Sequence, residues 1–336
     1  MERSDCVENG KRALQIGIYI IVMNKRDETR IIWIDWMKVI GMYFIILGHF
    51  FPFGYTFIYV FNVPVFFIIS GYLCQIEKSH LIFFRKILQR YIIPLMFISF
   101  AMFIWNWTKW EDNMKYTHSL YFLYSTLMGS QKCLGTGWFI YTLIIIRIIF
   151  QFSPSTNISH ISQFFIFSLI SIFLQYHNIH YFNAILNVST AYPLFIIGHL
   201  LSRQKGIINN FHNIRLLLLL SFVALFSIYI CGKLNGDVWM YNNDYGKSYI
   251  LFIGGALSGL TLLYVLSIMM ERRFTGIIQT LSIGNIVTLG FHPIIVAAIE
   301  PQNDYLVYII SFVILISFYP VIQLARKYCP LLIGST

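Results

Sequence analysis

Two ionisable side chains in one apolar stretch are the residues of this sequence best suited to chemistry. Lys38 and His49 lie in the segment from Ile31 to Phe51, about three helical turns or roughly 16 Å apart, and nearly on one face of an α-helix. Ionisable groups within such a stretch are costly, and they mark a functional site by default. The spacing suits an elongated ligand with an anionic head at Lys38 and a reactive part at His49.

His49 is the predicted catalytic residue. A neutral imidazole, the form that burial favours, can take a proton from a hydroxyl as a general base or accept a transferred group as a nucleophile. Asp35 lies three positions before Lys38 on the same face, and we expect it to orient Lys38 and keep it charged. The structural alternative for His49 is a histidine satisfied by a neighbouring helix.

The next apolar stretch combines polar and small residues. Asn62 stands beside Pro64, and Ser70 precedes Gly71 and Tyr72. One interpretation is a kinked helix that lines a cavity around His49, where Asn62, Ser70 and Tyr72 contact a ligand or a developing oxyanion. The other is close helix packing through small residues.

A basic run follows, formed by Arg85, Lys86 and Arg90. Arginine clusters bind phosphates through planar, multidonor geometry, so the run is a candidate binding site for a phosphorylated ligand. Its alternative role is to anchor the chain at the cytoplasmic face of a membrane.

His292 and Trp138 complete the candidate site residues. We expect His292 at a membrane depth similar to that of His49, so the two imidazoles could meet across a cavity. Trp138 begins an apolar segment, where an interfacial aromatic is the simplest interpretation. The cysteines are scattered and no His-x-x-x-His pair occurs, so the sequence predicts no metal site and no permanently bound cofactor.

The composition requires a membrane environment for these residues. Of the 336 residues, 57% are hydrophobic and 11% are charged, whereas a soluble domain has about 25% charged residues. This excludes a soluble enzyme and a disordered chain. It predicts an all-α, polytopic transmembrane helical bundle whose partner is the lipid bilayer. The Ile- and Phe-rich composition favours a bacterial source, and therefore a bacterial inner or plasma membrane.

About ten apolar segments are long enough to be candidate spans. They cover 31–51, 55–75, 88–106, 137–152, 161–177, 188–202, 213–232, 248–270, 278–299 and 304–325.

Threading ten spans with the N-terminus in the cytoplasm puts the basic residues mostly on the inner side. The exceptions are Lys109, Lys115, Lys132, Lys233 and Lys247. This explains the net charge of +10 without nucleic-acid binding, and it predicts both termini in the cytoplasm. We expect a cytoplasmic segment over 1–30, which includes a short apolar stretch and an alternative start at Met23, a membrane domain over 31–327 and a tail over 328–336. The outward loop at 107–136 is the predicted outer cap.

Six motifs in this order resemble the acyltransferase-3 family of integral-membrane acyltransferases. They are Lys38 with Leu47-Gly48-His49; Phe61-Asn62-Val63-Pro64 through Ser70-Gly71-Tyr72-Leu73; Arg85-Lys86 through Arg90 and Pro94; Gly137-Trp138-Phe139; Tyr192-Pro193 to Gly198; and Ser282-Ile283-Gly284-Asn285 to His292-Pro293. The resemblance covers most of the chain. It departs from the family at Lys38, where arginine is common, and at Asn62, where many members have histidine.

The resemblance implies transfer of an acyl group, most often acetyl from acetyl-CoA, to a sugar hydroxyl of a surface polysaccharide or glycolipid. The basic residues Lys38, Arg85, Lys86 and Arg90 would then hold the CoA phosphates, and the pantetheine arm would reach His49. A transporter or flippase for a lipid-linked saccharide is the alternative, although the chain lacks the inverted repeats typical of transporters. The acceptor, the acyl group and the oligomeric state stay open.

Overall fold

The computed structural model describes residues 30–111, 114–179, 184–204, 213–299, 301, 303 and 305–334. Within these ranges the chain forms helices and no strand, apart from an isolated bridge between Trp239 and Asp244. The predicted all-α fold is therefore confirmed. Of the expected N-terminal segment, residues 1–29 lie outside the described part of the chain.

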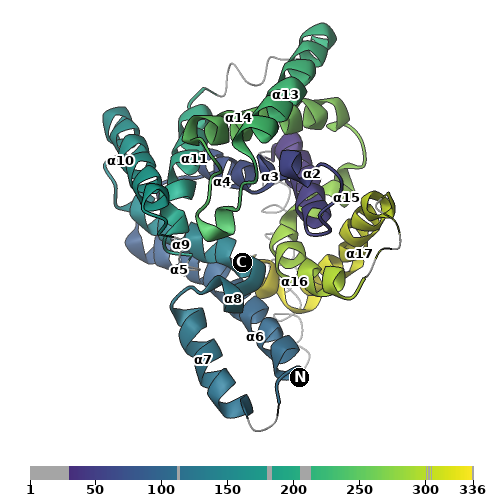
Figure 1. The fold of residues 1–336 in the computed structure, drawn as a ribbon. Coiled ribbons are helices and arrows are strands. Elements are labelled where there is room, and N and C mark those ends of the chain that lie inside the picture. Colours follow the sequence, from purple (N-terminus) through teal and green to yellow (C-terminus); the bar gives the residue numbers. More distant parts are fainter. Residues whose placement is uncertain are drawn as a thin grey trace, which may run out of the picture.

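Every predicted apolar segment contains a helix (Figure 1). They are α2 (Ile32–Gly48), α3 (Tyr55–Tyr59) with α4 (Asn62–Tyr72), α6 (Ile93–Trp107), α9 (Trp138–Gln151), α10 (Asn157–Tyr176), α11 (Asn187–Ser202), α13 (Ile214–Asn235), α14 (Tyr249–Met270), α15 (Thr275–Ile283) with α16 (Asn285–Ala297), and α17 (Leu306–Tyr328). Shorter helices are α5 (His80–Ile87), which continues into a π-helical turn at Leu88–Ile92, α7 (Lys115–Leu127) and α8 (Gln131–Leu134).

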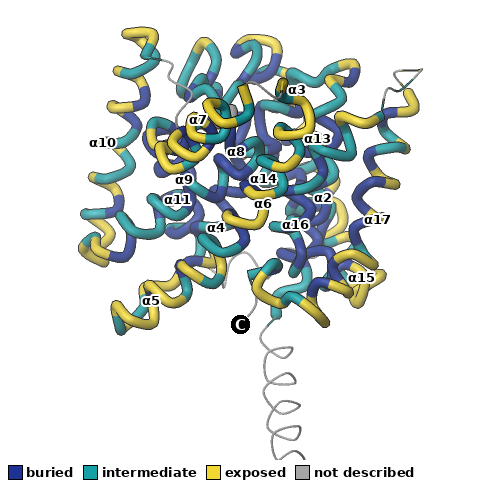
Figure 2. Tube along the Cα trace, turned by 90° about the horizontal axis from the view of Figure 1, so that it is seen from below, coloured by how far each residue is buried: buried dark blue, intermediate teal, exposed yellow. Residues whose placement is uncertain are grey.

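Six of the described helical stretches are long and apolar enough to cross a membrane, and the bent pair α15–α16 would make a seventh. The helices α2, α9 and α11 have only 17, 14 and 16 residues. The chain is thus a multi-pass helical membrane protein, while ten spans and cytoplasmic termini stay predictions. Figure 2 shows α3 near one end of the bundle and α5 and α15 near the other.

The tightest crossing joins α4 and α11 through two glycines. A methyl group on Gly71 would overlap the carbonyl oxygen of Phe195, and one on Gly198 would overlap the carbonyl oxygen of Ile68. Only glycine permits this backbone approach, as is common where membrane helices cross. The crossing fixes α4, which carries Asn62 and Ser70, against a helix that is buried over most of its length.

The ninth predicted span is broken at Gly284. The helices α15 and α16 meet there at an angle of 77°, and a side chain on Gly284 would overlap Ile322 of α17. The break places Ser282 and Asn285 at the bend between the two helices.

The expected outer cap at 107–136 and the segment 236–248 contact the bundle to different extents. The helix α7 projects beside α6 at the edge of the bundle (Figure 1), and most of its side chains are exposed. The segment 236–248, between α13 and α14, is instead tied to the bundle. Asn235 donates to the Tyr245 carbonyl at 2.7 Å and accepts from the Ser248 amide at 2.7 Å, while Gln175 bonds both Tyr245 and Gly246.

Candidate active site

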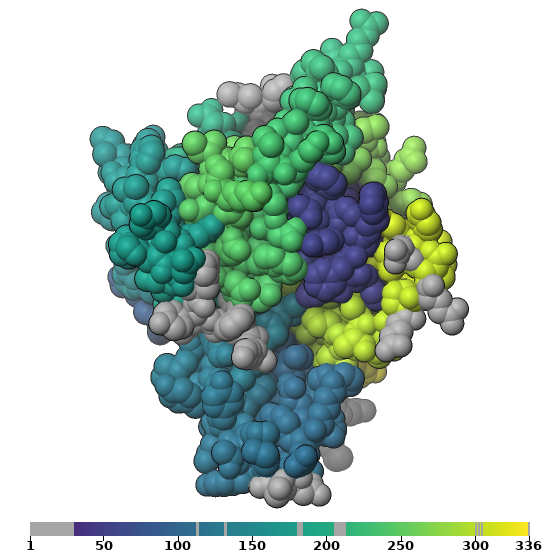
Figure 3. All heavy atoms as spheres, in the orientation of Figure 1, coloured from purple at the N-terminus to yellow at the C-terminus, as the bar shows by residue number. Residues whose placement is uncertain are grey.

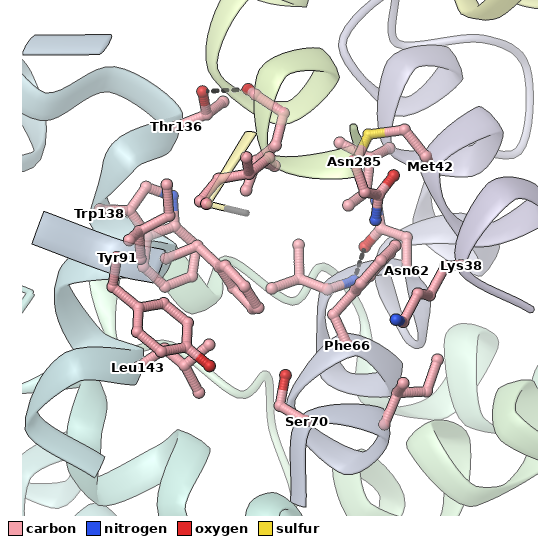
Figure 4. Close-up of a pocket in the computed structure, with 18 of the residues that line it drawn as sticks. Lys38, Met42, Asn62, Phe66, Ser70, Tyr91, Thr136, Trp138, Leu143 and Asn285 are labelled. Carbon is pink, nitrogen blue, oxygen red and sulfur yellow. Dashed lines mark hydrogen bonds between the residues drawn. The ribbon is translucent and has the colours of Figure 1, made fainter. Parts of the chain in front are cut away.

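A cavity of about 870 Å³ runs between the helices and contains most of the predicted site residues. It lies in the size range of small-molecule and cofactor sites. Figure 4 shows Lys38, Asn62 and Ser70 on one side of it, with Tyr91, Trp138 and Leu143 on the other. Seven predicted residues line the cavity: Lys38, His49, Asn62, Ser70, Lys86, Arg90 and Trp138.

His49 lies directly after the last residue of α2, with its half-buried side chain in the cavity wall. Its ring centroid is 4.9 Å from that of His292, so the expected meeting of two imidazoles occurs. The His292 ring is fully buried, and its Nδ1 lies 2.9 Å from the Thr288 carbonyl oxygen. A carbonyl only accepts, so Nδ1 carries the proton and Nε2 is an acceptor. That Nε2 has no partner among the described residues.

Asn62 brings an amide next to His49. A side chain on Gly48 would meet the Asn62 Nδ2 atom at 3.2 Å, so this amide lies close to the end of α2. The Asn62 Oδ1 atom accepts the Val63 amide at 2.8 Å, which orients the NH₂ group. An oriented N–H donor in the wall of a cavity can stabilise an oxyanion.

Lys38 lines the cavity farther along α2, without the partner that the sequence predicts for it. Asp35 instead forms a two-point ion pair with Arg30, at 2.5 and 3.0 Å, and accepts from the Ser282 hydroxyl at 2.6 Å. The expectation that Asp35 orients Lys38 is therefore corrected within the described residues. Arg30 reaches the carboxylate from just before α2, so the Lys38 ammonium stays directed at the cavity.

The cationic end of the cavity consists of Lys86, Arg90 and Arg147. Lys86 forms an ion pair of 2.6 Å with Glu77, which also lines the cavity. Arg147 contacts the Cys74 thiol and bonds the Gln75 carbonyl at 3.5 Å. The basic groups outnumber the acidic one, so this end favours an anion.

Four predicted residues lie outside the cavity lining. Arg85 is exposed on α5, because it is one position away from the face that Lys86 and Arg90 share. Tyr72 packs edge-to-face on Trp33 at 5.7 Å, and Asp35 is turned to Arg30 and Ser282. His292 lies behind His49 rather than in the wall. Trp138, predicted at the membrane interface, is buried in the wall.

Three parts of the cavity were not predicted. Arg147 is a single charge in the apolar run of α9. An ionisable group in a span is costly, and this signal could have identified Arg147 as a candidate. Trp239 and its neighbours come from the segment 236–248, and no local motif distinguishes this segment. Ile333 and Gly334, in the expected tail, close the cavity beside Arg90, since a side chain on Gly334 would meet the Arg90 carbonyl oxygen at 2.8 Å.

One family model matches residues 31–326 of the chain, and its description is an acyltransferase domain of the acyltransferase-3 type. The match spans nearly all of the helical bundle. This protein belongs to the acyltransferase-3 family. The family makes it a membrane acyltransferase, as the six motifs predict. No curated protein and no solved structure matches the chain significantly.

The cavity of this acyltransferase-3 protein is lined by groups suited to acid–base chemistry and to anion binding. Among the described residues no three His, Cys, Asp or Glu side chains cluster as metal ligands. The chemistry that the lining offers is proton transfer at His49, hydrogen bonding at Asn62 and charge stabilisation at Lys38 and the cationic end.

Proposed function

We propose that this protein transfers an acyl group, most simply acetyl, from acyl-CoA to a hydroxyl of a sugar in a surface polysaccharide or glycolipid. The observation that carries the proposal is one cavity that contacts both His49 and the basic residues Lys38, Lys86, Arg90 and Arg147. The CoA phosphates would bind the basic residues, and the thioester would lie at His49. The residues 32–48 of α2 are continuously helical, so Lys38 and His49 are separated by roughly 16 Å, a span suited to an extended donor arm.

The reaction begins with proton transfer to His49. The imidazole takes the proton of the acceptor hydroxyl as the oxygen attacks the thioester carbonyl, and a C–O bond forms. The Asn62 amide is the proposed donor to the resulting oxyanion. Collapse of the intermediate breaks the C–S bond, and the CoA thiolate leaves with the proton from His49. The acyl group ends on the sugar oxygen, and the enzyme returns to its starting state.

His292 is proposed as a positioning residue for His49. Its Nδ1–H is committed to Thr288, so its ring has a fixed orientation. The Nε2 acceptor has no partner among the described residues, and the two rings are 4.9 Å apart, so we propose an N–H of His49 as its donor during catalysis. Such a contact would orient the catalytic imidazole and select its tautomer.

The test is transfer of radiolabelled acetyl from acetyl-CoA to glycans in membranes that contain the full-length protein. We expect labelled glycan with the wild-type protein and none with His49→Ala at equal membrane levels. Acylation by His49→Ala would overturn the role of His49, and the absence of any acetyl-CoA turnover by the wild-type protein would overturn the donor.

A single-turnover experiment without acceptor separates the two routes through His49. General-base catalysis predicts no label on the protein after rapid denaturation. An acyl-histidine intermediate predicts label that His49→Ala abolishes, and that result would replace the base mechanism with nucleophilic catalysis.

A further inference from the structure

The wall of the cavity next to His49 is aromatic, in contrast to the cationic end. Phe51, Tyr59, Trp239 and Tyr241 all line it. The rings of Tyr59 and Trp239 are 5.0 Å apart, Phe51 stacks on Tyr59 at 6.2 Å, and Trp239 meets Tyr241 edge-on at 5.8 Å. We call Phe51, Tyr59 and Trp239 the aromatic surface.

The aromatic surface lies at the His49 end of α2. The Tyr59 hydroxyl donates to the Gly48 carbonyl at 3.2 Å, one residue before the proposed base. Figure 2 places α3, which carries Tyr59, at the opposite end of the bundle from α5. A ligand on these rings would therefore approach His49 from the side away from Lys86 and Arg90.

The backbone holds these rings in place before any ligand binds. Phe51 has a φ of 48°, a left-handed conformation that is unfavourable for a bulky residue and concentrates at functional sites. Its side chain is nevertheless 54% exposed, so packing in the core does not explain the conformation. Trp239 pairs with Asp244 through backbone bonds of 3.0 and 3.2 Å.

The segment that carries Trp239 is also anchored at both sides. The Asp237 carboxylate accepts from Tyr55 at 3.1 Å and from Thr56 at 2.8 Å, and Asn187 bonds the Tyr241 carbonyl at 3.3 Å. In Figure 3 the green residues of α13, α14 and the segment between them lie beside the purple residues of the α2–α3 region. Binding to a fixed surface avoids the entropy cost of ordering its side chains and backbone.

From these observations we propose that the aromatic surface binds the acceptor as a pyranose ring, with its hydroxyl at His49. Aromatic faces are electron-rich and attract the polarised C–H groups on one face of a sugar ring. An acyl chain would need only the apolar wall of Met42, Ile45 and Leu289, whereas the exposed ring of Phe51 extends the aromatic surface beyond that wall. This inference rests on the proposed function and assigns its acceptor subsite.

The test compares methyl hexopyranosides with glycerol as acceptors for purified full-length protein, with CoA release from acetyl-CoA as the readout. We expect a lower KM for the best pyranoside than for glycerol. The substitution Trp239→Ala should raise the pyranoside KM about three- to tenfold, with a much smaller change in the KM for acetyl-CoA. The conservative Trp239→Phe should restore most of the preference.

Two further variants separate stacking from support of the fold. Tyr55→Phe removes a bond to Asp237 but no part of the cavity wall, so we expect it to keep the pyranoside preference. Tyr116→Ala is the surface control, since this tyrosine is 76% exposed on α7.

Three outcomes would overturn the subsite. The first is a Trp239→Ala protein that still prefers pyranosides. The second is a wild-type protein that releases CoA equally well with glycerol. The third is a Trp239→Ala protein in which the preference for acyl-chain length changes and the preference for acceptor does not. In each case CoA release would still support the proposed donor. A wild-type protein that releases no CoA would instead overturn the proposed function.

Discussion

Among the described residues, two pairs of histidines have the same ring separation of 4.9 Å, and one of these pairs lies at the cavity. His49 and His292 meet at the cavity, which His49 lines. His160 and His199 meet among α9, α10 and α11, where Phe150 stacks on His160 and packs edge-on against His199.

The difference between the pairs is access to a ligand. Neither His160 nor His199 lines the cavity, and both are buried. Arg203 lies 3.3 Å from the His199 Nε2 atom; arginine only donates, so His199 is an acceptor there and is held neutral. Close imidazoles therefore occur both within packed helices and at the cavity, and the difference between the two pairs lies in their surroundings.

The largest expected effect is that of His49→Ala. General acid–base catalysis contributes about 10²–10⁴-fold, so we expect acyl transfer to fall by about 10³-fold. Transfer is measured with labelled acetyl-CoA at equal protein levels in the membrane fraction. Near-normal transfer would make the His49–His292 pair structural, like the other.

His292→Ala should have a smaller effect than His49→Ala, because His292 acts through His49. We expect a decrease in kcat of about 10- to 100-fold, in the range of other residues that orient a catalytic group, with little change in either KM. His292→Gln keeps an acceptor in the side chain and should recover part of the rate. A rise in the KM for acetyl-CoA with unchanged kcat would contradict the positioning role.

Arg147→Ala should weaken donor binding by about tenfold or more, since a charge-assisted hydrogen bond contributes about 1.5–3 kcal/mol and about 1.4 kcal/mol corresponds to tenfold. The measurement is the KM for acetyl-CoA with the acceptor saturating. Arg85→Ala is the matched control, because Arg85 is exposed outside the cavity lining. Equal effects of the two substitutions would indicate general surface charge rather than a site.

The smallest expected effect is that of His160→Phe. A phenyl ring preserves the stacking on Phe150 and removes two ring nitrogens that have no partner in the described part of the chain. Replacing such groups by apolar ones of similar shape is nearly neutral. We expect unchanged acyl transfer and a similar melting temperature in detergent. A loss of transfer without a loss of stability would show that this second pair is functional.

The sequence predicted the helices well because long apolar stretches have few alternatives in a membrane. It also brought His49, Asn62 and Ser70 to one cavity, since each lies in a short motif on a defined helix. It placed Arg85 incorrectly because a cluster of basic residues does not show which of them share a helix face, and Arg85 is one position away from the face of Lys86 and Arg90.

The missing parts of the site come from contacts that no local pattern encodes. Trp239 reaches Tyr59 through a segment held by Asn235, Gln175 and Asn187, which lie on three different elements. Arg30 replaced Lys38 as the partner of Asp35 because it enters from the chain just before α2. Such contacts depend on the tertiary arrangement, and the spacing of charged residues along a helix does not determine which residues pair.

The glycine crossing of α4 and α11 also constrains how the protein can move. Backbones in direct contact at Gly71 and Gly198 leave no side-chain layer that could slide, so we expect these two helices to move as one unit. We therefore expect the admission of a bulky glycan to depend on another part of the bundle, where the kinked pair α15–α16 meets α17. Spin labels across that part should report breathing, whereas labels across the crossing should stay at one distance.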